Sequence, residues 1–155
     1  MSKKNIDVLV ISLTSPLLVG IYHEDELIKT FSSQEKTSDI LPIFFEKILK
    51  QYQCQNLYFA NGPGSFMAIK ITYLFLKTLS ISLNVPLFAT NGFSFNEKSP
   101  IKAVGSLYFI EENGTIRTQK IDVKNTNLIP FSLPKHLDKQ IFSDQTKPLY
   151  ILPAV

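Results

Sequence analysis

The chain has 155 residues, the length of one domain or of two small lobes that share a boundary. Hydrophobic residues make up 45% of it and its net charge is only +3, so it has ample core material and lacks the strong positive charge of a nucleic-acid-binding protein. The single cysteine, Cys54, excludes an internal disulfide; with two histidines and no Cys-x-x-Cys motif, we expect no zinc site and no cofactor. Lys70 and Lys77 interrupt the longest apolar segment, and the N-terminus lacks the apolar centre of a signal peptide. We therefore expect no membrane span and a cytoplasmic location.

The first third of the chain has the pattern of three short strands. Residues 6–12 (IDVLVIS) are β-branched and apolar, as in a central strand. Residues 14–16 (Thr-Ser-Pro) form a turn into a second apolar run at 17–22. The polar residues 23–26 then favour a tight hairpin into a third run at 27–31. The prediction is an antiparallel meander.

A helix is predicted next, over residues 39–52. Its apolar residues recur at helical spacing, and its charged residues lie mostly on the other side. Because Pro42 is tolerated only near a helix start, we expect the cap near Ser38 or Asp39.

A strand, a glycine turn, a long helix and another strand follow. Residues 57–60 are apolar, and residues 61–64 (Asn-Gly-Pro-Gly) are turn formers. A helix is predicted from its cap at Ser65 to its stop near Asn84, and Pro86 opens the next strand. This is a βαβ unit, and it completes the order βββαβαβ.

The long helix carries more apolar residues than one sheet contact requires. A narrow polar stripe is predicted from i, i+3, i+7 spacing, and it contains Lys70, Tyr73, Lys77, Ser80 and Asn84. A helix that covers one sheet needs an apolar stripe of only about 100° or a little more. The pattern leaves two alternatives open: burial on both sides within the fold, or burial of one side by a partner.

The chain is predicted to divide into an N-terminal lobe, residues 1–95, and a reduced, mostly β lobe, residues 96–155. The second lobe is expected to contain a strand within 102–110, a hairpin turn at 112–114, a strand at 115–123, a loop at 125–134, a short helix or strand at 136–142, and a terminal strand at 148–152.

The glycine turn carries a resemblance to a known family. Residues 62–66 (Gly-Pro-Gly-Ser-Phe) resemble the Gly-Pro-Gly-Ser-Phe-Thr-Gly-Leu-Arg segment of the TsaB (YeaZ) family, and residues 83–87 (Leu-Asn-Val-Pro-Leu) resemble the end of its following helix. Residues 37–42 are similar to the family's His-Ser-Glu-x-Leu-Leu-Pro segment, and residues 148–150 to its Pro-x-Tyr-Leu-Arg segment. The resemblance covers residues 6–95 well. It implies an α/β fold of the actin-like (ASKHA, ribonuclease H-like) class.

The resemblance also implies a function. TsaB-like proteins are inactive paralogues that support N6-threonylcarbamoyladenosine modification of tRNA. They form a heterodimer with a TsaD subunit, and a TsaE ATPase joins the larger complex. This chain would then contact tRNA only indirectly and have no catalytic residues. The implied partner interface comprises Leu41, Phe45, Phe66, Lys70, Tyr73, Leu74, Lys77 and Ile81.

Several departures from the family pattern argue against chemistry of the chain's own. The first strand continues Ser12-Leu13-Thr14-Ser15 instead of Asp-Thr-Ser, so a carboxylate that could help to hold metal and phosphate is missing. Met67, Ala68 and Lys70 stand where the family has Thr, Gly and Arg.

The glycine turn has two possible roles, phosphate cradle or tight strand-to-helix turn. It matches neither GxxxxGK[ST] nor GxGxxG, and Pro63 removes one backbone donor, so we interpret Gly62, Pro63, Gly64 and Ser65 as a structural turn. His23 and His136 have no nucleophile at a recognisable spacing. The alternatives to a scaffold subunit are a small nucleotide-binding enzyme of the actin-like superfold and a homodimeric scaffold.

Overall fold

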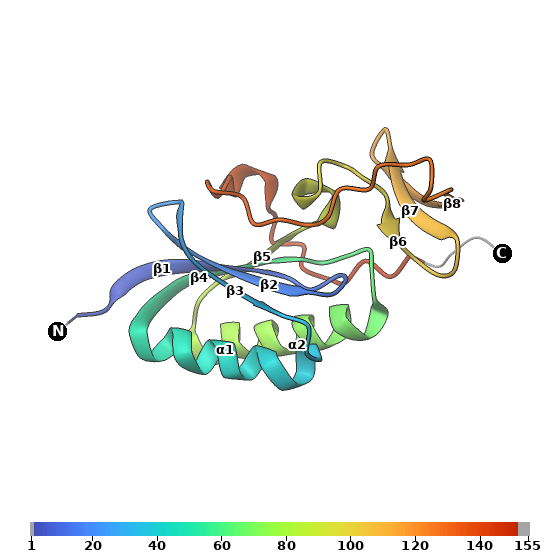
Figure 1. The fold of residues 1–155 in the computed structure, drawn as a ribbon. Helices are drawn as coiled ribbons and strands as arrows, with labels where there is room; N and C mark the ends of the chain where they lie inside the picture. The colour runs from blue at the N-terminus through green and yellow to red at the C-terminus, as the bar shows by residue number, and fades with distance from the viewer. Residues whose placement is uncertain (1, 152–155) are drawn as a thin grey trace.

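The computed structural model describes residues 2–151 and shows a mixed five-stranded sheet with two long helices (Figure 1). The strand order is β3-β2-β1-β4-β5. In chain order the elements are β1 (Lys4–Ile11), β2 (Leu17–His23), β3 (Glu26–Ser33), α1 (Thr37–Gln51), β4 (Tyr52–Ala60), α2 (Phe66–Leu83) and β5 (Leu87–Thr90). The order βββαβαβ predicted for this part of the chain is thus the observed one.

Strand β1 is at the centre of the sheet because it is apolar on both sides. It pairs antiparallel with β2 and parallel with β4. Val8 and Val10 belong to the core cluster on the side of the helices, and Leu9 and Ile11 to a second cluster on the opposite side. All four side chains are buried. A strand buried on both faces reads as a continuous apolar run, as residues 6–12 do.

Helices α1 and α2 lie side by side on one face of the sheet (Figure 1). The predicted ends of α2 are confirmed: the Ser65 hydroxyl accepts from the Ala68 N–H at 3.4 Å, and Asn84 takes the left-handed conformation with φ 55°. Helix α1 differs slightly. It begins at Thr37 with Lys36 as an N-cap that makes no side-chain hydrogen bond, and it passes directly into β4 at Tyr52. The strand is therefore longer than predicted.

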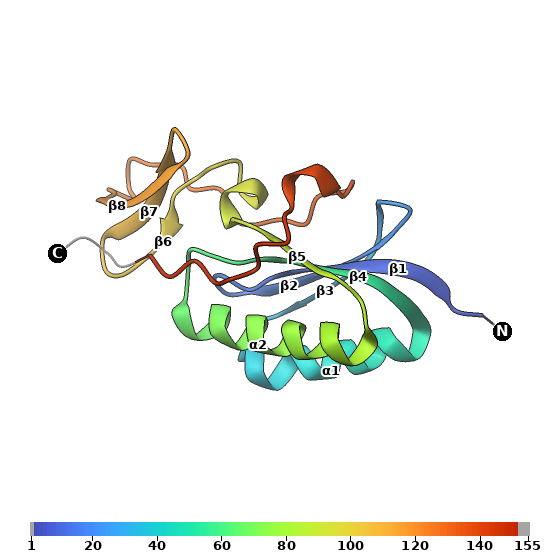
Figure 2. The ribbon, with the colours of Figure 1, turned by 180° about the vertical axis from the view of Figure 1, so that it is seen from behind.

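The opposite face of the sheet is covered by segments from the second half of the chain (Figure 2). One is the short helix η1 (Gly92–Phe95). The other is residues 131–143, which we call the strap; it contains the 3-10 helix η2 (Lys139–Ile141). Leu137 of the strap is 1% exposed in the apolar cluster on this face, and the Phe142 ring lies 4.7 Å from that of Tyr58.

A second, three-stranded sheet lies at one end of the molecule (Figure 1). Its strands are β6 (Ile101–Lys102), β7 (Leu107–Glu112) and β8 (Thr115–Lys120), in the order β6-β7-β8. The predicted hairpin is confirmed, with Asn113 and Gly114 both at positive φ, as a tight two-residue turn requires. The predicted terminal strand is wrong for residues 148–151, which form no strand, and Leu152 lies outside the described residues.

Candidate functional site

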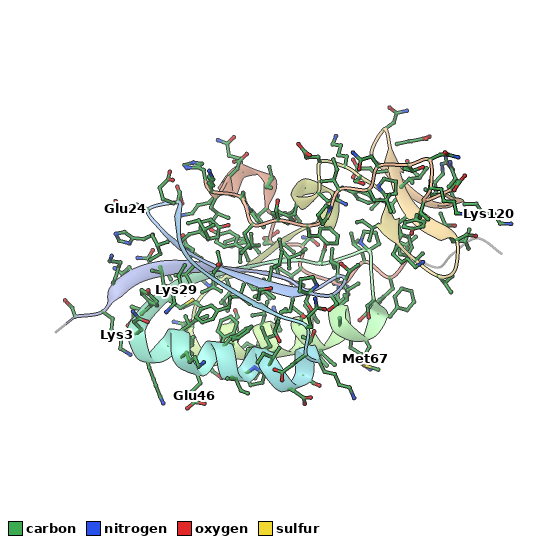
Figure 3. The ribbon with its side chains drawn as sticks, in the orientation of Figure 1. Lys3, Glu24, Lys29, Glu46, Met67 and Lys120 are labelled. Atoms are coloured by element: carbon green, nitrogen blue, oxygen red, sulfur yellow. The ribbon has the colours of Figure 1, made fainter. Side chains whose placement is uncertain are left out.

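The outer face of α2 carries an exposed row of large apolar side chains. Met67, Leu74 and Ile81 are 66%, 53% and 71% exposed. Figure 3 shows Met67 at the start of α2, pointing away from the sheet. The three residues are seven positions apart, so they lie along one side of the helix. Lys70 and Lys77, also exposed, lie between them in the sequence. We call these five residues the α2 outer face.

This face corrects the predicted polar stripe. Lys70 and Lys77 are exposed as expected, but Tyr73 and Ser80 are half-buried, and Tyr73 packs against the core. The exposed line of the helix is therefore a mixture of methionine, leucine, isoleucine and lysine. Phe66, at the first turn, is 40% exposed and forms an edge contact with the Tyr150 ring at 5.2 Å.

Two residues of the predicted interface belong to the interior. Leu41 is 0% and Phe45 1% exposed, both in the core cluster between the helices and the sheet. The Phe45 ring packs 5.4 Å from that of Phe75 on α2. Helix α1 uses its apolar side to cover the sheet, so these side chains cannot contact a partner. The exposed large apolar residue of α1 is Ile43.

Helix α2 also bears on the expectation that the chain has no membrane span. Its 18 residues are long and apolar enough to cross a membrane by length and composition alone. Only Ile69, Thr72 and Leu76 are fully buried in the fold. Within the described part of the chain, the outer side of this helix has no cover.

The glycine turn before α2 is packed tightly against two other segments. A Cβ on Gly62 would lie 2.5 Å from the Leu149 carbonyl oxygen, and one on Gly64 would lie 2.6 Å from that of Leu13. The Ser65 N–H donates to the same Leu13 oxygen at 2.9 Å. These close approaches place the start of α2 against the end of β1, and they fit the interpretation of a structural turn.

A cavity of about 580 Å³ opens where α1 and α2 begin and the β1–β2 turn passes between them. Hydroxyl groups dominate its polar lining, and the Ser12 and Thr37 hydroxyls share a hydrogen bond of 2.8 Å. Its charged lining residues are Glu35 and Lys36, one of each sign. Such a lining can hydrogen-bond a polar molecule. It brings Thr14 and Ser15, which the sequence analysis treated only as turn formers, next to the helix starts.

A charged cluster joins the strap to the sheet on the other side of the molecule. Lys139 of the strap lies 3.2 Å from Asp7 Oδ2 and 3.1 Å from Asp25 Oδ1. Burial, together with the nearby Asp7 carboxylate, raises the pKa of Tyr58 to about 12. No pattern in the sequence predicts this cluster, because its members are distant along the chain. Cys54 is buried in β4 near Asp7, and burial raises its thiol pKa to about 12, which argues against a nucleophile.

The fold of the chain resembles that of YeaZ. The structure of YeaZ from Pseudomonas aeruginosa superposes with a TM-score of 0.59 over 77% of this chain and 64% of that one, at 16% sequence identity. A second structure, described as an uncharacterized protein with similarity to peptidase YEAZ from Pseudomonas aeruginosa, gives a TM-score of 0.56 with the same coverage and identity. The chain thus spans a little under two thirds of these proteins. No family model and no curated protein matches it.

Proposed function

We propose that the protein is a non-catalytic subunit with an actin-like N-terminal lobe, which binds a TsaD-like partner through the α2 outer face. In this role it supports N6-threonylcarbamoyladenosine modification of tRNA in the cytoplasm, with a TsaE-like ATPase joining the complex. The resemblance of residues 62–66 to the TsaB family and the YeaZ-like fold support this proposal.

The observation that carries the proposal is the exposed apolar row of α2. Large apolar side chains that lie together on the surface of a small protein mark interaction sites. Leu74 and Ile81 would form the centre of the contact, and Lys70 and Lys77 would form charged contacts at its rim.

Co-expression with the TsaD-like subunit of the same genome, followed by size-exclusion chromatography with light scattering, tests the proposal. We expect the wild-type chain to co-elute with the subunit and the Leu74→Glu variant to elute alone. A carboxylate at Leu74 would be desolvated in the interface but remains in water in the free protein, so the free fold should be unchanged. Circular dichroism of the isolated variant checks the fold.

Val123→Glu is the matched control, because Val123 is 52% exposed and follows β8 of the small sheet, outside α2. It should co-elute like the wild type. A wild-type chain that never associates with the TsaD-like subunit contradicts the proposal, and so does a folded Leu74→Glu variant that still binds. Light scattering of the isolated chain also reports a homodimer that uses the same helix.

The cavity of about 580 Å³ at the helix starts favours one second candidate, a small nucleotide-binding enzyme. Titration calorimetry of the isolated chain with ATP and magnesium separates the two. Micromolar binding or turnover by the isolated chain would favour the enzyme over the scaffold.

A further inference from the structure

A second cavity, of about 300 Å³, lies between the β1–β2 turn, the small sheet and residues 128–131. It shares Thr14 and Ser15 with the larger cavity, and none of the residues of the α2 outer face line it. An inference drawn from it is therefore independent of the proposed function.

Tyr108 of β7 brings an unused polar group to this cavity. The residue is only 5% exposed, yet it lines the cavity. Its hydroxyl forms no hydrogen bond with any of residues 2–151. A phenol hydroxyl can donate one hydrogen bond and accept others, and buried polar groups of native proteins normally have partners. A molecule bound in the cavity that Tyr108 lines can supply this missing partner.

Lys102 of β6 lies beside Tyr108, because the two residues are register partners on adjacent strands. Its Nζ atom is 5.3 Å from the centre of the Tyr108 ring and donates to the Gly105 carbonyl oxygen at 2.7 Å. An ammonium group has three donors, so two remain. Among the described residues that line the cavity, Lys102 alone carries a charge, and the site therefore favours a single negative charge.

The rest of the lining is mostly apolar and stiff. Pro16 and Pro100 contribute rings that restrict their own backbone, and Phe131 contributes an aromatic ring. The loop before Pro100 is fixed by the Asn96 side-chain amide, which donates to the Ser99 carbonyl oxygen at 2.8 Å. Apolar walls around a few placed polar groups are typical of sites for small organic molecules.

We propose that this cavity binds a small amphipathic monocarboxylate. The carboxylate accepts hydrogen bonds from the Lys102 ammonium and the Tyr108 hydroxyl, and the apolar body of the ligand packs against the proline rings and Phe131. A volume of about 300 Å³ is at the lower end for ligand sites, which limits the ligand to a small molecule. A phosphate monoester suits the site less, because its second negative charge would find no second cation among the described lining residues.

Phenylacetate, titrated into the ¹⁵N-labelled full chain and followed by NMR, tests this site. We expect saturable shifts of the Lys102 and Tyr108 amide signals. Tyr108→Phe and Lys102→Gln should each weaken binding about tenfold or more, the effect of losing one hydrogen bond to a charged group. Tyr150→Phe and Lys120→Gln make the same chemical changes outside the cavity and should leave the affinity unchanged. Phenylacetamide, the neutral analogue, should bind at least about tenfold more weakly.

Three results would overturn the proposal: no saturable binding of phenylacetate, equal binding of phenylacetamide, or unchanged affinity in both cavity variants. If Tyr108→Phe should fail to fold, the phenylacetate affinity of Lys102→Gln still tests the proposal. Lys102 is exposed, so its substitution changes no buried side chain. None of these outcomes depends on association with a TsaD-like subunit.

Discussion

Asp7 places a carboxylate in the interior of the molecule, on the sheet face that the strap covers. It is 4% exposed, and its two oxygens are hydrogen-bonded to Asn56 Nδ2 at 2.7 Å and paired with Lys139 Nζ at 3.2 Å. A buried charge is tolerated only when it is paired and hydrogen-bonded. Lys139 also pairs with Asp25 at 3.1 Å, so one lysine holds β1, the β2–β3 turn and the strap together.

Replacing Lys139 should destabilise the fold, because the buried Asp7 carboxylate would lose its paired cation. We expect Lys139→Met to lower the free energy of unfolding by about 1–2 kcal/mol, less than for a fully buried pair because the lysine is 45% exposed. Urea denaturation measures the change. Adding Asp7→Asn should recover part of the loss, since the unpaired charge disappears. A Lys139→Met protein as stable as the wild type would contradict this role of the lysine.

His136 of the strap should make a pH-dependent contribution to stability. The hydrogen bond from its Nδ1 to Glu26 Oε1, 2.8 Å long, raises the pKa of the histidine above 6.5. A raised pKa means that the folded state holds the proton more tightly than the unfolded state does. The stabilisation is thus fully present below pH 6.5 and is lost as the pH rises through the folded-state value.

NMR titration of the imidazole signals measures this pKa directly. In the Glu26→Gln variant the pKa of His136 should fall, because the charged acceptor is gone. An unchanged His136 pKa in that variant would show that Glu26 is not the cause.

At the scale of elements, the turn before α2 fixes where the helix starts. Gly64 contacts the Leu13 backbone so closely that an added Cβ would lie 2.6 Å from its carbonyl oxygen. We expect Gly64→Ala to cost about 3 kcal/mol, since backbone must move to make room. Gly105→Ala is the control: its Cβ would meet nothing within 4 Å, so it should cost only the left-handed strain of about 1 kcal/mol. Thermal unfolding of both proteins measures the difference, and equal losses would contradict it.

The same helix shows how far the sequence could be interpreted. Its ends follow from local chemistry, namely the Ser65 hydroxyl at the start and the αL-tolerant Asn84 at the end, so sequence reasoning located both. Its orientation does not follow. Tyr73 and Ser80 are half-buried because the side of α2 that carries them is turned toward the rest of the fold. A helix that is apolar nearly all round has no single apolar side from which the sequence could predict which side packs on the sheet.

The second face of the sheet was the least predictable part. The strap has no periodic apolar pattern, and its key residues Leu137 and Lys139 find their partners only through tertiary contacts. Phe45 is a second example of a contact that only the tertiary structure reveals. Helix α1 was correctly predicted to be amphipathic, but its residue Phe45 was assigned to a partner interface, whereas it packs in the core of the fold.

For the whole molecule, the strap separates a packed sheet face from solvent, and Leu137 is its anchor. Leu137→Asp should place a charge where the residue is 1% exposed, lower the unfolding free energy by several kcal/mol and expose an apolar face. Increased fluorescence of the dye ANS, together with urea denaturation, measures both effects. Ile141→Asp, on the same strap but at a 42% exposed site, should change stability by no more than about 0.5 kcal/mol. Similar behaviour of the two variants would contradict the anchoring role.

The contacts of the strap also bear on the order in which the protein folds. The Tyr22 hydroxyl donates to the Pro134 carbonyl oxygen across 112 positions of sequence, and His136 reaches Glu26 across 110. Contacts of such long separation close large loops, which slows folding. During synthesis, the meander and both helices emerge from the ribosome well before residue 137. Until then the apolar sheet face around Leu9 and Tyr22 is exposed to solvent. During this interval the nascent chain can aggregate or bind chaperones.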